Sequence, residues 1–193
     1  MMVGGSAAEA PVEGVQRQLE LYVPPLNFAM VSPGIYRSGY PVPRNFPFLR
    51  MLGLKSIVHL GPDEYLPANS AFAAEQGVTV FHAPLSGNKE PFISIDDEQL
   101  QDALLPLLQP DNFPLLIHCN KGKSRTGCVV GCFRKLQNWS ISAIFEEYCR
   151  HAGAPTVTPA GDARTFPAGV CVADRVVLGD RRGEHDSDRP AVY

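Results

Sequence analysis

One segment restricts the fold of this chain more than any other: Leu115–Gly127, with the sequence LLIHCNKGKSRTG. It begins with an apolar run that is typical of a buried strand, and this strand carries Cys119 to its carboxyl end. A loop of five residues follows, and Arg125 then opens a stretch with the pattern of a helix. The segment therefore predicts a strand, a tight loop and a helix in immediate succession, with a cysteine at the base of the loop.

Such a loop is suited to binding an anion. Its successive backbone N–H groups can converge on one point, and the N-terminus of the helix adds the positive end of its dipole. Gly122 permits the backbone dihedrals that the curl requires. The planar guanidinium of Arg125 can hold two oxygens of a phosphate group. These residue types at this spacing predict a phosphate site.

Cys119 would lie at the bottom of that site, where the same N–H groups and helix dipole favour its thiolate. A thiolate beneath a bound phosphorus can attack in line and form a phosphocysteine, which water then hydrolyses. Arg125 and the loop amides would stabilise the charge on the equatorial oxygens. Thr126 could donate its hydroxyl to the departing thiolate. The alternative is a buried cysteine at a strand end, followed by a basic turn without catalytic role.

The rest of the chain alternates strand and helix patterns, which predicts an α/β fold with a central, mainly parallel sheet flanked by helices on both faces. In such folds ligands bind beyond the carboxyl ends of the strands, where Cys119 is expected. The predicted strands are a hairpin over Val31–Tyr40 and single strands over Lys55–Leu60, Val78–His82 and Pro114–His118. The predicted helices cover Pro43–Leu52, ended by Gly53, Ser70–Gln76, capped by Asn69, Arg125–Asn138 and Ile141–His151. A further helix is opened by Ser94 and Asp97 and weakened by Pro106, and its apolar face is Leu100, Leu104, Leu107 and Leu108.

Composition excludes several classes of protein. The chain has 193 residues and a net charge of -3, so it carries no overall basic signature for nucleic acid. Its five cysteines lack paired spacing, which argues against a disulfide framework and favours the reducing cytoplasm, with the nucleus as a second location. No segment resembles a signal peptide or a membrane span. No motif indicates a metal or cofactor, and phosphocysteine chemistry needs neither.

The motifs together resemble a known family. HCNKGKSRTG resembles the signature of protein-tyrosine and dual-specificity phosphatases, and PGIYRSGYP, SIVHL and GNKEPF are similar to the plant and fungal atypical dual-specificity phosphatases. The resemblance covers about Leu26 to Gly153. It implies the protein-tyrosine-phosphatase-like fold and cleavage of the diphosphate of inositol pyrophosphates. It also implies that protein-tyrosine or phosphoinositide substrates are alternatives.

The loop lysines agree with a densely phosphorylated small molecule. Lys121 and Lys123 lie within the predicted phosphate loop and Lys89 in the preceding polar loop, although each could equally be a solvated lysine. A phosphotyrosine substrate would instead need an aromatic wall, for which Phe92 and Tyr40 are candidates. The full predicted set of substrate-binding residues is Asn88, Lys89, His118, Asn120, Lys121, Gly122, Lys123, Ser124 and Gly127.

The general acid is the least defined part of the predicted site. The resemblance implies an acid on a mobile loop about thirty residues before the cysteine, and Glu90 is the only acid of residues 87–91. Asp97 is better explained as a first-turn helix residue. A phosphate leaving group needs less protonation than a tyrosyl oxygen, so the lack of an aspartate favours an inositol pyrophosphate. The resemblance implies that His118 orders the loop, whereas His59, His82 and His151 are expected to be structural or at the surface.

Three segments are expected: a flexible lead-in at residues 1–20, the phosphatase domain at 21–153, and an atypical, poorly ordered tail at 154–193. The tail is rich in Gly, Pro, Asp and Arg and shows no final helix, whereas the family continues with a basic stretch and one more helix. The tail therefore keeps open a further alternative, a phosphate-binding module without turnover. A sulfur-transfer or arsenate-reducing enzyme is disfavoured because no resolving cysteine is evident.

Overall fold

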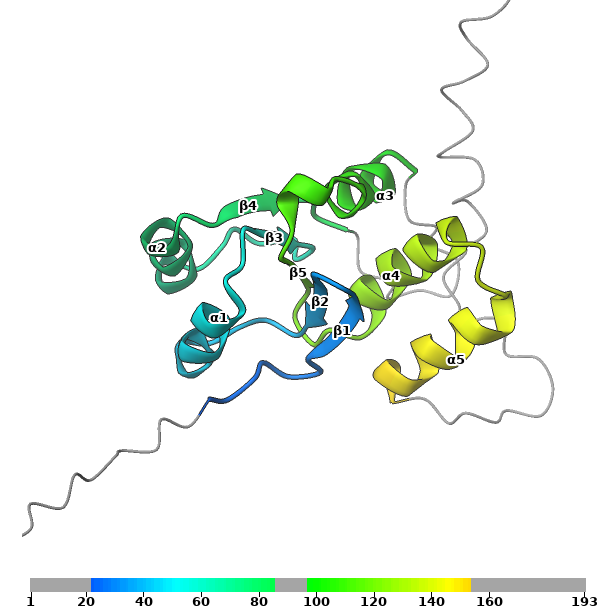
Figure 1. Cartoon of the computed structure of the whole chain (residues 1–193), viewed down its shortest axis with the longest axis horizontal. Helices are drawn as coiled ribbons and strands as arrows, with labels where there is room; N and C mark the ends of the chain where they lie inside the picture. Colours follow the sequence, from blue (N-terminus) through cyan, green and yellow to red (C-terminus); the bar gives the residue numbers. More distant parts are fainter. Residues whose placement is uncertain (1–21, 86–96, 154–193) are drawn as a thin grey trace, which may run out of the picture.

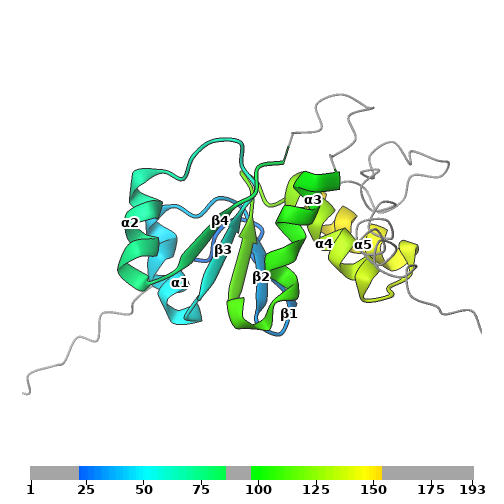
Figure 2. The ribbon, with the colours of Figure 1, turned by 90° about the horizontal axis from the view of Figure 1, so that it is seen from above.

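Short apolar runs alternate with helices along the chain, and each run becomes a strand of one sheet (Figures 1 and 2). The computed structural model describes residues 22–85 and 97–153. The strands are β1 (Ala29–Ser32), β2 (Ile35–Ser38), β3 (Ser56–His59), β4 (Thr79–His82) and β5 (Leu115–His118). The helices are α1 (Phe46–Leu52), α2 (Pro67–Gln76), α3 (Asp97–Leu104), α4 (Ser124–Leu136) and α5 (Ile141–Ala152), with 3-10 turns η1 (Pro43–Asn45), η2 (Leu105–Leu108) and η3 (Pro110–Asn112).

The sheet has the strand order β1-β2-β5-β3-β4. The hairpin partners β1 and β2 are antiparallel, and the other neighbouring pairs are parallel. The predicted α/β fold with a mainly parallel sheet is thereby confirmed. β5, which leads to Cys119, occupies the centre of the sheet, so the site lies where several carboxyl ends meet.

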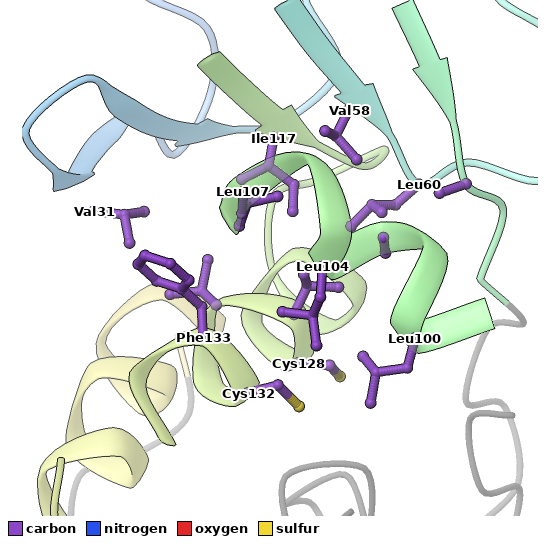
Figure 3. Close-up of a cluster of buried hydrophobic side chains, with 14 of the residues drawn as sticks. Val31, Val58, Leu60, Leu100, Leu104, Leu107, Ile117, Cys128, Cys132 and Phe133 are labelled. Carbon is purple, nitrogen blue, oxygen red and sulfur yellow. The ribbon is translucent and has the colours of Figure 1, made fainter. Parts of the chain in front are cut away.

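Two apolar clusters hold the helices on the sheet. On one face α1 and α2 pack on residues such as Ile57 and Leu116. On the other face α3 and α4 cover Val58 and Ile117, whose side chains point from the strands toward the helices (Figure 3). Figure 2 shows α5 outside α4, on the side away from the sheet. The inner strands β3 and β5 are thus buried on both faces, as continuous apolar runs in parallel sheets generally are.

The observed helices confirm most of the helix predictions and correct two: the cap of α2 and the apolar face that follows α3. The hydroxyl of Ser140 accepts from the Ala143 N–H at the start of α5, as expected of an N-cap. The prediction that Asn69 caps α2 is wrong: the helix already begins at Pro67, and the Asn69 amide donates to the Pro41 carbonyl instead, 2.9 Å away. A proline at the first position favours that earlier start.

Pro106 ends α3 as its missing N–H requires, and the chain continues as the 3-10 turn η2. This change of helix type also explains the second correction. Leu100, Leu104 and Leu107 are buried, whereas Leu108 is 46% exposed and does not join the predicted apolar face. The proposed capping partner Ser94 lies outside the described residues.

A buried ion pair joins α4, α5 and the edge of the sheet. The Nε of Arg134 lies 2.8 Å from an oxygen of Glu147, and its Nη2 donates to the Val31 carbonyl. Its guanidinium also covers the ring of Trp139, at 4.1 Å from the centroid. Among the described residues, no helix is long and apolar enough to cross a membrane.

Candidate active site

Cys119 follows β5 directly and is almost completely buried, at 3% exposure. The neighbouring strands end level with it, because His118 pairs in register with Ser38 of β2 and with His59 of β3. Residues 120–124, here called the phosphate loop, then lead into α4. The predicted succession of strand, loop and helix is confirmed.

Every carbonyl from position 120 to position 123 accepts a hydrogen bond from a group outside the phosphate loop, the last of them from the first turn of α4. Their donors are the Tyr40 N–H to Asn120 at 2.9 Å, the Asn27 amide to Lys121 at 3.2 Å, the Arg37 Nη2 to Gly122 at 2.9 Å and the Gly127 N–H to Lys123 at 2.7 Å. The loop is therefore fixed by its carbonyl groups.

The planarity of trans peptides determines where the N–H groups of the phosphate loop point. In such a peptide the carbonyl and the following N–H point in opposite directions. Because four successive carbonyls face protein donors, the N–H groups of residues 121–124 face away from those donors. Within the described part of the chain, none of these four N–H groups donates to a main-chain carbonyl. A row of free backbone N–H groups at a helix N-terminus is a concave anion site.

The loop approaches β2 so closely that only glycine fits. Gly122 has a φ of +67°, and a Cβ added there would lie 2.5 Å from the carbonyl carbon of Ser38. Gly39 on the opposite side is similarly tight, since its Cβ would lie 3.2 Å from the Asn120 oxygen. Gly122 thus has both of the roles that a tight anion loop demands, an unusual dihedral and close backbone contact.

Arg125 lies in the first turn of α4 and is half-buried. Its Nη1 donates to the carbonyl of Leu60, the residue that follows β3, at 3.2 Å. The guanidinium therefore reaches from the helix toward the neighbouring strand end. Thr126 is fully buried, and its hydroxyl has no hydrogen-bond partner among the described residues.

A row of histidines at three strand ends supports the site, and the sequence interpretation missed it. The ring of His118 stacks on His59 at 4.9 Å between centroids, and His59 stacks on His82 at 5.2 Å. The Tyr65 hydroxyl lies 3.1 Å from the His118 Nε2. Burial, aided by His59, lowers the pKa of His118 to about 3, so this ring is neutral at physiological pH. The signal was a histidine at the last or the second-last position of each of three predicted strands.

Arg37 is a second residue that sequence reasoning missed. It lies on β2, is 1% exposed, and its guanidinium contacts the phosphate loop from the buried side through Gly122. Burial lowers its pKa to about 10, and the nearby charges of Glu147 and Cys119 oppose that shift. The guanidinium is therefore still charged at neutral pH. The only signal was a basic residue in the middle of a strand pattern.

The predicted binding residues in and after the phosphate loop have different surroundings. Lys121 is exposed on the phosphate loop. The Lys123 ammonium lies beside Gly153 at the end of α5, where a Cβ on that glycine would be 3.3 Å from it. That end carries the negative pole of the helix dipole, which accounts for the position of the lysine. Ser124 hydrogen bonds to the Tyr148 hydroxyl, and Gly127 lies against the Tyr148 ring.

Four of the other predicted site residues lie outside the described residues: Asn88, Lys89, Glu90 and Phe92. The ring of Tyr40 meets His118 edge-on at 5.2 Å, so this aromatic candidate is next to the site. Within residues 22–85 and 97–153, no three His, Cys, Asp or Glu side chains are grouped as metal ligands.

A buried cysteine at the base of a loop with outward-facing amides, followed by an arginine in the next turn, has the geometry that suits a nucleophile beside a bound phosphate. Residues 22–160 match the tyrosine phosphatase family, and the chain belongs to that family. It is 54% identical over 135 residues to inositol diphosphatase DSP4 of Arabidopsis thaliana, covering 70% of this chain and 68% of that one.

Solved structures agree. The core catalytic domain of the PP-IP phosphatase SIW14 from S. cerevisiae, in complex with citrate, superposes with a TM-score of 0.67 at 42% identity, covering 80% of this chain and 87% of that one.

A probable tyrosine-protein phosphatase of Dictyostelium discoideum is 47% identical, covering 69% of this chain and 80% of that one. The chain spans 68%, 60% and 65% of the lengths of three inositol diphosphatases that it resembles, from Arabidopsis and rice.

Proposed function

We propose that this chain is a cysteine-dependent phosphatase that cleaves the diphosphate of inositol pyrophosphates through a phosphocysteine intermediate. The observation that carries the proposal is the position of Cys119 at the base of a loop whose carbonyls at residues 120–123 all accept hydrogen bonds from protein donors. Four convergent amides and Arg125 would bind the terminal phosphate, and the thiolate would lie beneath its phosphorus.

The reaction has two steps. The Cys119 thiolate attacks the terminal phosphorus, a P–S bond forms, and the bond to the bridging oxygen breaks so that the inositol phosphate leaves. Water then attacks the phosphocysteine, inorganic phosphate leaves, and the thiolate returns. Arg125 and the loop amides stabilise the equatorial oxygens in both transition states. The Thr126 hydroxyl, which has no hydrogen-bond partner among the described residues, is available to the sulfur as it leaves in the second step.

Three considerations support this substrate. The relatives named inositol diphosphatase include proteins at 54% and 50% identity. The leaving group, a phosphate, needs little protonation, which suits a site whose candidate acid is Glu90. Lys121, exposed on the phosphate loop, can meet further phosphates of the same ring. A catalytic thiolate also favours a reducing compartment, and we propose the cytoplasm with the nucleus as a second location.

A protein-tyrosine phosphatase is the second candidate. The relative in Dictyostelium carries that description, and the ring of Tyr40 beside His118 offers an aromatic wall. Such a substrate has a poorer leaving group and would depend more strongly on an acid. Glu90→Gln would then slow hydrolysis of the phosphotyrosine peptide far more than hydrolysis of the diphosphate.

The experiment compares phosphate release by the full chain from a diphosphoinositol phosphate, a phosphotyrosine peptide and a phosphoinositide, with Cys119→Ser as control. We expect a preference of at least about tenfold in kcat/KM for the diphosphoinositol phosphate, equivalent to about 1.4 kcal/mol in transition-state binding. A preference for the peptide would establish the second candidate. Release from none of the three would overturn both and leave a phosphate-binding module.

A further inference from the structure

Arg37 combines three properties that rarely occur together. It is charged, it is 1% exposed, and among the described residues no carboxylate lies within ion-pair distance of it. Its Nε and Nη1 are buried without a hydrogen-bond partner in the part of the chain that the structure describes. An isolated buried charge destabilises a protein by several kcal/mol. A fold that keeps one therefore needs a compensating anion or a function for the charge.

The position of the guanidinium indicates which anion. Nη2 donates to the Gly122 carbonyl at 2.9 Å, and a Cβ on Gly127 would lie 3.8 Å from the same nitrogen. Arg37 therefore lies beneath the phosphate loop, between its centre and the first turn of α4. Its charge also interacts with that of the Cys119 thiolate. Of the negative groups that act on this guanidinium, Glu147 already pairs with Arg134, which leaves the Cys119 sulfur and a phosphoryl group bound above it.

The hydrogen bond has a second effect through the peptide plane. By holding the Gly122 carbonyl on the buried side, Arg37 turns the Lys123 N–H toward the opposite side, where the anion binds. A carbonyl released from this bond could rotate, and the N–H would then leave the ring of donors. Arg37 is the only side chain among the four loop anchors that carries a charge.

We propose that Arg37 is a positioning residue for phosphoryl transfer, which fixes the phosphate loop through the Gly122 carbonyl and stabilises the Cys119 thiolate from below with its buried charge. The proposal rests on the phosphatase function proposed above. It assigns Arg37 a role distinct from that of Arg125, because Arg125 lies on the substrate side of the loop and Arg37 on the buried side.

The test uses two readouts that need no turnover. The first is the pH midpoint of Cys119 alkylation by iodoacetamide, followed by mass spectrometry of the peptide that contains Cys119. The second is the concentration of inorganic phosphate that halves the alkylation rate. Arg37→Met removes the charge at similar length, Arg37→Lys retains it without the fork, and Arg50→Met is the control because Arg50 pairs with Glu75 on exposed surface.

For Arg37→Met we expect the alkylation midpoint to rise by about one pH unit and phosphate protection to weaken by about tenfold. Arg37→Lys should keep the midpoint near that of the native chain and still weaken phosphate protection. Arg50→Met should change neither. A folded Arg37→Met protein with both native values would overturn the proposal. If Arg37→Met does not fold, native phosphate protection in Arg37→Lys would overturn it instead.

These readouts separate the two proposals. A chain that releases phosphate from no substrate would refute the proposed function, yet its thiolate and phosphate affinity would still report on Arg37. Conversely, the native chain could release phosphate while the Arg37 variants keep the native alkylation midpoint and the native phosphate protection. That result would refute only the role of Arg37.

Discussion

The Tyr65 hydroxyl lies 3.1 Å from Nε2 of His118, the residue immediately before the nucleophile. His118 is fully buried, and its ring contacts Tyr40, His59 and Tyr65. The segment after β3 thus reaches across two strand ends and fixes the base of the phosphate loop. Because His118 directly precedes Cys119 in the chain, we expect this contact to restrict the backbone that carries the cysteine.

Tyr65→Phe should weaken both stability and catalysis. The ring remains, but a buried nitrogen of His118 loses its partner, which costs about 1–3 kcal/mol of unfolding free energy. We expect kcat to fall several-fold with a smaller change in KM. Urea unfolding and phosphate-release kinetics measure the two effects. Tyr36→Phe is the matched control, since Tyr36 stacks on Phe28 away from the site and should change stability by less than about 0.5 kcal/mol. Equal effects of the two substitutions would contradict this role of Tyr65.

Acidification should destabilise the fold through His118. Its pKa is about 3 in the folded state against 6.5 when unfolded, so below pH 6.5 the unfolded chain binds the proton that the folded chain refuses. Stability is therefore lost as pH falls from 6.5 toward 3, by about 2 kcal/mol at pH 5 from this group alone. Burial also lowers the pKa of His59 and His151, which adds to the loss in the same direction.

The measurement is the unfolding free energy in urea at pH 7 and pH 5. His118→Asn, which does not titrate, should show a smaller difference between the two pH values than the native chain. An identical difference in both proteins would show that His118 does not control this pH dependence.

Gly122→Ala should abolish phosphate release and strongly destabilise the domain. The added methyl meets the Ser38 backbone at 2.5 Å in addition to the strain of a positive φ. We expect a cost above about 3 kcal/mol. Gly53→Ala is matched to it, with a φ of +60° and nothing within 4 Å of the added Cβ. It should cost about 1–2 kcal/mol and leave kcat unchanged. Thermal unfolding and activity assays compare the pair, and a Gly122→Ala protein as active as Gly53→Ala would refute the close contact.

Asn27→Gly should loosen the phosphate loop from the end of α5. The Asn27 amide donates to the Lys121 carbonyl at 3.2 Å and to the His151 carbonyl at 3.1 Å. Glycine accommodates the φ of +57° at this position, so the substitution isolates the side chain. We expect a loss of about 1–2 kcal/mol in stability and a several-fold rise in KM. Asn138→Gly, at a φ of +62° on the exposed end of α4, is the control and should leave KM unchanged. A native KM in Asn27→Gly would exclude this coupling.

Local signals in the sequence predicted local structure well. Gly53, Gly77 and Gly153 end their helices as expected, Ser140 caps α5, and the strand predicted before Cys119 forms as β5. Each of these features depends on a few neighbouring residues. The start of α2 was misplaced because Pro67 and Asn69 both carry helix-start signals, and a distant carbonyl engages the asparagine.

The supporting contacts of the site could not be predicted in the same way. The Arg37 bond to Gly122 joins residues 85 positions apart, and the stacking of His59 on His118 depends on the register between β3 and β5. Hydrophobic periodicity carries no information about either. A charged residue in a strand pattern and a histidine at each strand end were visible in the sequence, but only the sheet order makes them neighbours.

Asn27 connects the phosphate loop and α5 across 94 and 124 positions of sequence. During synthesis the segment that carries Asn27 leaves the ribosome long before either of its partners. These two hydrogen bonds must therefore wait for nearly the whole domain, and proteins rich in such distant contacts generally fold slowly. Cys119 gains its complete set of loop anchors only when both ends of the domain have met, so thiolate reactivity should appear late in folding and report that the domain has closed.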